Sequence, residues 1–71
     1  MPRYFFDIHN GRRHTDDRGE ELGDDNDAWR SALRLTRDVE DNLAPGGQWE
    51  LQVRQGDRPL FRIEVKSEWL K

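Results

Sequence analysis

The side chains best suited to metal or acid–base chemistry lie near the start of the chain: Asp7, His9 and His14. His14 follows Asn10-Gly11, a pair that favours a two-residue hairpin turn. With that loop, Asp7 would face His14 across the hairpin, and all three side chains would share its outer face. Histidine and carboxylate together can bind a metal ion, but no glutamate or cysteine motif accompanies them. We therefore expect an exposed cross-strand Asp–His pair, and no metal ion or other cofactor.

Elsewhere the sequence lacks the motifs that carry enzymatic chemistry. Ser31 and Ser67 have no nucleophile-elbow context, and the patterns GxGxxG, Walker A and HExxH do not occur. A single sheet and helix of this size rarely enclose a pocket. We assign no catalytic residue and do not expect an enzyme.

The composition is that of one small domain over residues 1–71. Only 32% of the residues are hydrophobic and 38% are charged, so the core must be small. The chain has no cysteine, which excludes disulfides and thiolate metal sites as sources of stability. Association with another chain is a remaining way to bury more apolar surface.

The net charge of −3 argues against a general nucleic-acid binder. No apolar run approaches the roughly 20 residues of a membrane span, so no membrane partner is expected. Apolar alternation begins by Tyr4, with no secretory signal before it. These features together predict a cytoplasmic location.

The stretch from Asp24 to Leu43 is predicted to be a helix. Asp24 is a suitable N-cap, because its carboxylate can accept hydrogen bonds from free first-turn amides. Pro45 ends the pattern, since proline cannot continue the hydrogen-bond ladder. Five apolar residues recur with helical spacing and should face a sheet: Ala28, Ala32, Leu35, Val39 and Leu43.

A hairpin is predicted on each side of this helix, over residues 3–16 and 48–66, followed by a tail over 67–71. The first strand is far more apolar than its partner, so we expect it inside the sheet and the partner at an edge. Alternation places these side chains toward the helix: Tyr4, Phe6, Ile8, Trp49, Leu51, Val53, Phe61, Ile63 and Val65. The predicted fold class is α+β, with ββαββ order and one helix on one face of a four-stranded, mainly antiparallel sheet.

Two blocks of this sequence resemble a known family. They are the opening Met1-Pro2-Arg3-Tyr4-Phe5-Phe6 and the pattern Asp-Asp-x-Gly-x-Glu-Leu of residues 16–22. They resemble short uncharacterised bacterial proteins, common in rhizobia, that carry only a domain-of-unknown-function label. The resemblance implies a short stand-alone bacterial protein and supplies no activity or catalytic residue. The layout of hairpin, acidic-glycine turn and alanine-containing helix also resembles HicB-type antitoxins.

The sequence favours an interaction or self-association module, with a homo-oligomer or another protein as partner. Four apolar side chains fall outside the predicted sheet–helix contact and form the candidate interface: Trp29, Leu33, Phe5 and Trp69. The alternative is a nucleic-acid-binding or antitoxin-like regulator. Its candidate anion contacts are Arg30, Arg34 and Arg37 on the helix, with Arg12 and Arg13 on the hairpin. Acidic residues interleave the helix arginines, which favours a solvated helix face.

Overall fold

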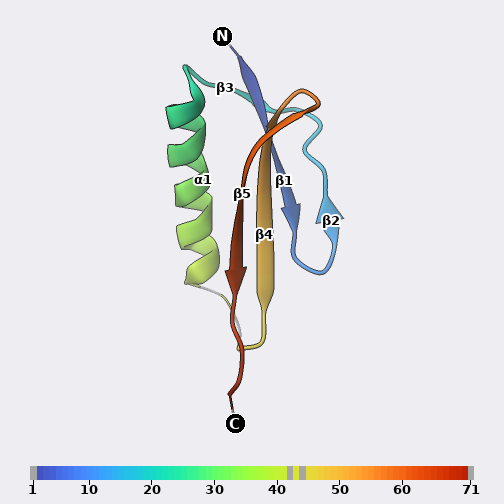
Figure 1. Cartoon of the computed structure of the whole chain (residues 1–71), viewed down its shortest axis with the longest axis vertical. Helices are drawn as coiled ribbons and strands as arrows, with labels where there is room; N and C mark the ends of the chain where they lie inside the picture. The colour runs from blue at the N-terminus through green and yellow to red at the C-terminus, as the bar shows by residue number, and fades with distance from the viewer. Residues whose placement is uncertain (1, 42, 44, 71) are drawn as a thin grey trace.

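In a computed structural model, which describes residues 2–41, 43 and 45–70, a helix packs across one face of an antiparallel sheet (Figure 1). The elements in chain order are β1 Arg3–His9, β2 Arg13–His14, β3 Glu20–Glu21, α1 Asp25–Glu40, β4 Gln48–Gln55 and β5 Arg58–Lys66. The predicted α+β layering and the ββαββ core order are confirmed. The difference is β3, a two-residue strand within a segment that the sequence presents as a turn.

The sheet joins the two hairpins through β1 and β4, in the order β2-β1-β4-β5, with β3 also paired to β1. As predicted, β1 lies inside the sheet and β2 at its edge. Phe6 lies opposite Val53 and Ile8 opposite Leu51 in the antiparallel ladder between β1 and β4. The apolar faces of the two hairpins therefore form one continuous floor beneath the helix.

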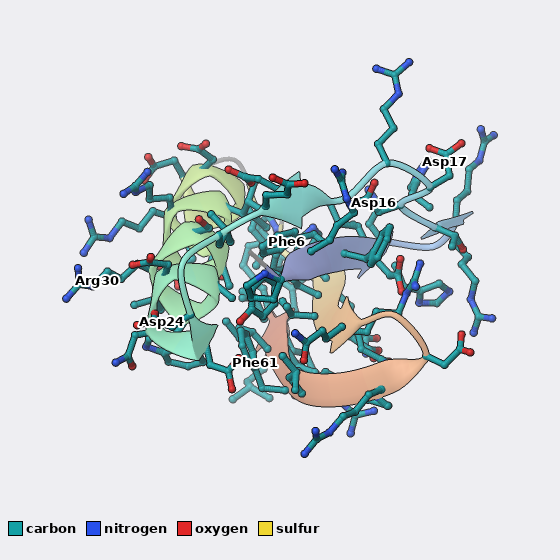
Figure 2. All side chains as sticks on the ribbon, turned by 90° about the horizontal axis from the view of Figure 1, so that it is seen from above. Phe6, Asp16, Asp17, Asp24, Arg30 and Phe61 are labelled. Carbon is teal, nitrogen blue, oxygen red and sulfur yellow. The ribbon has the colours of Figure 1, made fainter. Side chains whose placement is uncertain are left out.

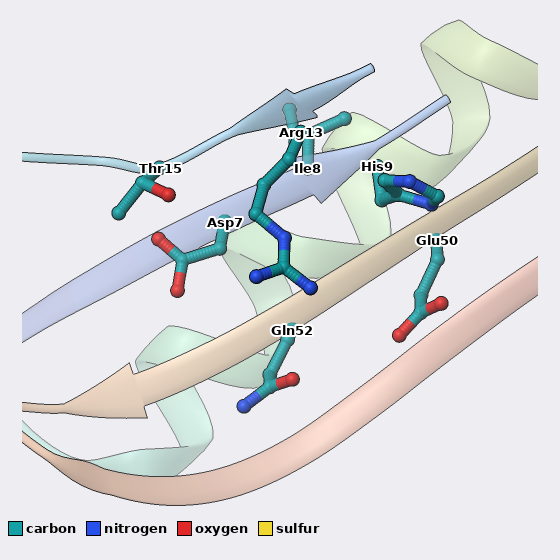
Figure 3. A pocket seen from close by; sticks show the side chains of 7 residues that line it. All are labelled: Asp7, Ile8, His9, Arg13, Thr15, Glu50 and Gln52. Carbon is teal, nitrogen blue, oxygen red and sulfur yellow. The ribbon is translucent and has the colours of Figure 1, made fainter. Parts of the chain in front are cut away.

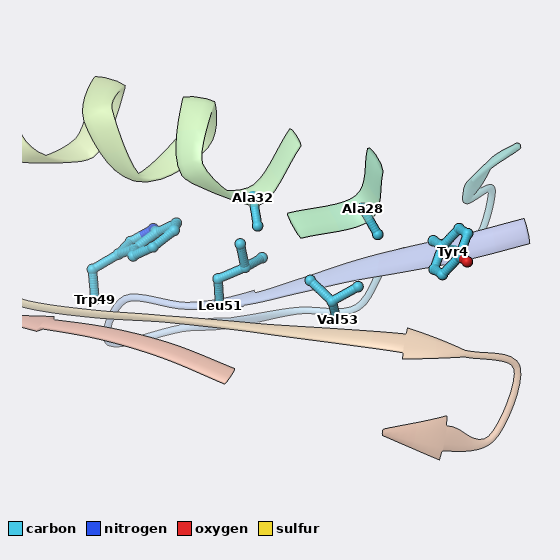
Figure 4. Close-up of a cluster of buried hydrophobic side chains, with 6 residues drawn as sticks. All are labelled: Tyr4, Ala28, Ala32, Trp49, Leu51 and Val53. Carbon is cyan, nitrogen blue, oxygen red and sulfur yellow. The ribbon is translucent and has the colours of Figure 1, made fainter. Parts of the chain in front are cut away.

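The core lies between this floor and α1 (Figure 4). Its buried hydrophobic residues are Tyr4, Ala28, Ala32, Trp49, Leu51 and Val53. The two helix alanines have small side chains, which let the helix approach the sheet closely at Leu51 and Val53. Thr36 is also buried, and its hydroxyl donates to the Ala32 carbonyl at 2.9 Å. That hydrogen bond satisfies a polar group which would otherwise be costly to bury.

The helix begins as predicted and ends earlier than predicted. The Asp24 carboxylate accepts a hydrogen bond from the Asp27 N–H at 3.0 Å, which makes Asp24 the N-cap. The helix stops at Glu40 instead of reaching Leu43. Pro45 has no N–H to donate to a carbonyl four residues earlier, and the chain must reverse direction before β4. Among the described residues, no helix combines the length and apolar character needed to cross a membrane.

The register of the first hairpin differs from the prediction by one residue. Ile8 pairs with His14 and His9 with Arg13, so Arg12 belongs to the loop. A two-residue type I′ turn needs positive φ at both central residues. Gly11 has φ of +95°, whereas no described non-glycine residue has a positive φ. The loop is therefore longer, and the one-residue shift places His14 on the face opposite the one predicted.

The second hairpin turns tightly between Gln55 and Arg58, which face each other. Val53 pairs with Phe61, yet the next residue of β4 pairs with Pro59, so Leu60 is an extra residue in a β-bulge. The regular part of β5 therefore runs from Phe61 to Lys66. The Ser67 N–H donates to the Gly47 carbonyl at 2.9 Å and holds the start of the tail, beyond which Trp69 is exposed.

Candidate functional site

An apolar surface lies where the flank of α1 meets β5. It consists of Trp29, Leu33 and Phe61, and we call it the α1–β5 surface. Trp29 is 43% exposed and Leu33 is 36% exposed, although both are large hydrophobic residues. The Phe61 ring lies 5.1 Å from the indole ring of Trp29, between centroids, at an interplanar angle of 72°. Phe61 thus covers one side of the Trp29 indole, and much of the rest of the indole faces solvent.

Phe5 does not join this surface, because it lies on the other face of the sheet. It pairs across the ladder with Arg54, whose guanidinium carbon lies 4.5 Å from the Phe5 ring centroid. The Gly19 backbone also approaches the ring so closely that an added Cβ would lie 2.9 Å from Phe5 Cε2. Phe5 is therefore half-buried beneath Arg54 and the 16–19 loop. Trp69 lies in the tail, so the four predicted interface residues do not form one patch.

Arg54 is the centre of a hydrogen-bonded network on this outer face. Its Nε donates to Asp7 Oδ2 at 2.7 Å, and a terminal nitrogen donates to the Asp16 carbonyl at 2.9 Å. A second terminal nitrogen donates to the Gly56 carbonyl at 2.9 Å. The hydrogen bond to Asp7 raises the pKa of Arg54 above its ordinary value despite partial burial. With its donors engaged, Arg54 connects β4, β1 and the 16–19 loop.

The Asp16 carboxylate performs a second structural task in the same region (Figure 2). Its Oδ2 accepts from the Phe6 N–H at 3.1 Å, between the residues of β1 that pair with β2 and β3. Its Oδ1 accepts from the amides of Arg18 and Gly19 at 3.0 and 3.1 Å. Partial burial acts to raise the pKa of Asp16, but these three amides outweigh it and lower that pKa below its ordinary value.

Sequence reasoning missed both Arg54 and Asp16 as organising residues. Arg54 alternates outward on its strand, so the pattern marks it as solvent-facing. The spacing of Asp16 with the amides two and three residues later is the local signature of an Asx-type turn, and could have been found. The hydrogen bond from Phe6 is non-local, and only the folded strands bring the two residues together.

The predicted trio of Asp7, His9 and His14 is not assembled. The register pairs His14 with Ile8, and Arg13 takes the place opposite His9. A shallow hollow on the outer face is lined by Asp7, Ile8, His9, Arg13, Thr15, Glu50 and Gln52 (Figure 3). Asp7 in this hollow is held by Arg54. Across the described ranges, no three histidine, cysteine or acidic side chains are grouped to hold a metal ion.

Comparison with known proteins identifies a family. The model described as "Domain of unknown function (DUF6894)" matches residues 3–66. The chain belongs to this family. No curated protein and no solved structure matches the chain significantly. The description of this family assigns no activity to the DUF6894 domain.

The arginines predicted to contact an anion lie on different sides of this DUF6894 domain. Arg30, Arg34 and Arg37 are exposed on α1, and Figure 2 shows Arg30 extending from the helix away from the sheet. Arg13 instead lines the hollow on the outer face of the sheet (Figure 3). The sheet lies between the helix arginines and Arg13, so a nucleic-acid strand bound to the helix arginines would not reach Arg13. The fold therefore does not combine these arginines into one basic surface.

A buried tyrosine fixes the start of α1 to the sheet in the DUF6894 domain. The Tyr4 hydroxyl donates to Asp25 Oδ1 at 2.7 Å, and only 1% of the Tyr4 surface is exposed. This hydrogen bond, burial and the neighbouring acidic charges raise the pKa of Tyr4 to about 12. The contact positions the first turn of the helix, and with it Trp29, above the sheet.

Proposed function

We propose that this domain is a self-association module, a protein–protein interaction domain that binds a second copy of itself through the α1–β5 surface. The observation that carries the proposal is the exposure of Trp29 and Leu33 on one helix flank, directly beside an edge strand. Large apolar side chains grouped in this way are typical of association surfaces.

The composition supports a partner of this kind. A chain of 71 residues with 32% hydrophobic content buries a small core, and the absence of cysteine leaves no disulfide to stabilise it. A second copy that covered Trp29 and Leu33 would bury more apolar surface. Each Å² removed from water would stabilise the dimer by about 25 cal/mol. The edge position of β5 adds unpaired backbone groups that another strand can satisfy.

The test is the solution molar mass, measured by light scattering over a hundredfold range of concentration. We expect a dimer for the natural sequence, and we expect Trp29→Ala to raise the dimer dissociation constant more than tenfold. Trp69→Ala is the matched control, because it removes the same side chain from an exposed site outside the α1–β5 surface. A monomer at every concentration would overturn the proposal, and so would equal effects of the two substitutions.

A further inference from the structure

Strand β5 is an open edge with a limited usable length. It ends the strand order, and no segment in the described part of the chain pairs with its outer side (Figure 2). Pro59 and the bulge at Leu60 disrupt the first part of the strand, as is common where an edge must be protected from unwanted pairing. The stretch from Phe61 to Lys66 is regular and remains available to another strand.

We propose that a second copy of this chain pairs antiparallel along this edge, with Ile63 lying opposite Ile63 of the partner subunit on a two-fold axis. The inference rests on the proposed function and specifies how the two copies meet. In this register Arg62 faces Glu64 of the partner subunit, and the symmetry makes this contact twice. Phe61 correspondingly faces Val65 of the partner subunit. Opposite charges and apolar pairs directly across a ladder are both stabilising.

The two nearest registers that keep the apolar faces of both strands on the same side of the sheet place like charges opposite each other. Centring the pair on Arg62 sets two arginines face to face on the axis. Centring it on Glu64 sets two glutamates face to face and places Arg62 opposite Lys66 twice. Like charges directly opposite destabilise a strand pair. The charge order of Arg62, Glu64 and Lys66 therefore selects the register centred on Ile63.

Registers shifted by an odd number of residues fail for a different reason. They place the apolar face of β5, with Phe61 and Ile63, on the same side as the polar face of the other copy. Phe61, Ile63 and Val65 pack against the core on the helix side of the sheet. An odd shift would put the two helices on opposite faces and divide the apolar surface.

The register centred on Ile63 keeps both helices on the same face. Trp29 contacts Phe61 of its own chain, so its exposed side would lie near the two-fold axis, above the partner strand. Leu33 follows one helical turn later on the same flank. The α1–β5 surfaces of the two copies would then cover each other, which accounts for the exposure of Trp29 and Leu33 in a single copy.

Arg62 already has two acidic neighbours within one copy. Its Nε lies 3.3 Å from Glu64 Oε1, and a terminal nitrogen lies 3.6 Å from Glu50 Oε1. The Arg62 and Glu64 side chains are 59% and 54% exposed, and exposed ion pairs contribute little. Both side chains are therefore free to reach across the axis without losing a strong contact.

A charge-exchange experiment tests the register with the full chain. Arg62→Glu gives a copy with acidic side chains at positions 62 and 64. Glu64→Arg gives a copy with basic side chains at the same two positions. Each variant alone sets like charges opposite in its homodimer, so we expect the dissociation constant to rise about tenfold or more. An equimolar mixture sets opposite charges opposite each other again, so we expect it to dimerise about as tightly as the natural sequence.

The control is Arg58→Glu, which makes the same charge change on β5 before the bulge and should leave dimerisation unchanged. Circular dichroism melts confirm that each variant is folded. If the natural sequence dimerises and both variants dimerise equally well, the register is wrong while the proposed function stands. Two weakened variants that do not rescue each other also overturn the register. A natural sequence that stays monomeric overturns the proposed function itself.

Discussion

The indole ring of Trp29 and the phenyl ring of Phe61 meet edge to face, with centroids 5.1 Å apart and planes inclined at 72°. This geometry is a favourable one for two aromatic rings, because the positive edge of one ring faces the negative face of the other. The contact connects the helix flank to the edge strand. It therefore belongs both to the fold of one copy and to the surface proposed for association.

A double-mutant cycle on the monomer measures what this ring contact contributes to the stability of a single copy. Trp29→Ala and Phe61→Ala should each destabilise the monomer, and the double variant should lose about 0.5–1.5 kcal/mol less than the sum. The measurement is urea unfolding at a protein concentration low enough to keep the chain monomeric. Trp29→Ala combined with Phe5→Ala is the control, because these residues lie on opposite faces and should be additive. Additivity of Trp29 and Phe61 would show that the ring contact contributes nothing to the fold.

Asp16 should make the domain sensitive to acid. Its pKa is lowered in the folded state, so its contribution to stability is present above the ordinary value of 3.8 and is lost as the pH falls through the folded-state value. Asp16→Asn replaces one acceptor oxygen with a donor and should cost about 1.5–3 kcal/mol at neutral pH. The difference from the natural sequence should shrink as the pH approaches 3.

The measurement for Asp16 is the free energy of unfolding in urea, followed from pH 6 to pH 2.5. The control is Asp17→Asn, which makes the same chemical change one residue away, at a side chain that is exposed. A constant difference between Asp16→Asn and the natural sequence across this range would contradict the assigned role of the carboxylate.

Tyr4 should impose a limit at the alkaline end. Its pKa of about 12 in the folded state exceeds the ordinary value of 10.0, so the hydroxyl favours folding while it stays protonated. That stability is complete below pH 10 and is lost as the pH rises from about 10 to about 12, because the unfolded chain releases the proton first. Tyr4→Phe should lower the melting temperature at pH 7 and lose this alkaline slope. A slope of unchanged steepness in Tyr4→Phe would assign it to other groups.

The inner faces of the strands could be predicted from sequence because burial on one side imposes a period of two. Phe6 and Ile8 alternate on one hairpin as Leu51 and Val53 do on the other, and both sets face the helix. The way the hairpins join could not be predicted, since β1 and β4 are far apart in the chain and each has an apolar face that many registers would satisfy. Strand order is a long-range property that local alternation does not contain.

The predicted pairing of Asp7 with His14 across the first hairpin was wrong for a local reason. Asn10-Gly11 favours a tight turn, but Asn10 does not adopt positive φ here and Arg12 joins the loop. This single extra loop residue moved His14 to the other face and placed Arg13, instead of Arg12, opposite His9. The exposure of Trp29, by contrast, followed from helical spacing alone, because a large side chain on the flank lies outside the contact with the sheet.

Gly19 should be the least replaceable of the turn glycines. Its φ of +70° already disfavours a side chain, and a Cβ there would lie 2.9 Å from the Tyr4 carbonyl oxygen and 2.9 Å from Phe5 Cε2. The backbone oxygen cannot move aside without disturbing β1. Gly56 also has a positive φ, of +60°, but nothing lies within 4 Å of its added Cβ.

Gly56→Ala should therefore cost about 1–2 kcal/mol, the conformational penalty alone. Gly19→Ala should cost about 1–3 kcal/mol more, since the 16–19 loop must lift away from Phe5 and Tyr4. Urea unfolding of both variants measures the difference. A larger loss for Gly19→Ala, with a weaker contact between Arg54 and Phe5 seen as a changed chemical shift of the Phe5 ring, would show that the loop presses on the outer face. Equal losses would mean that the loop is not held against β1.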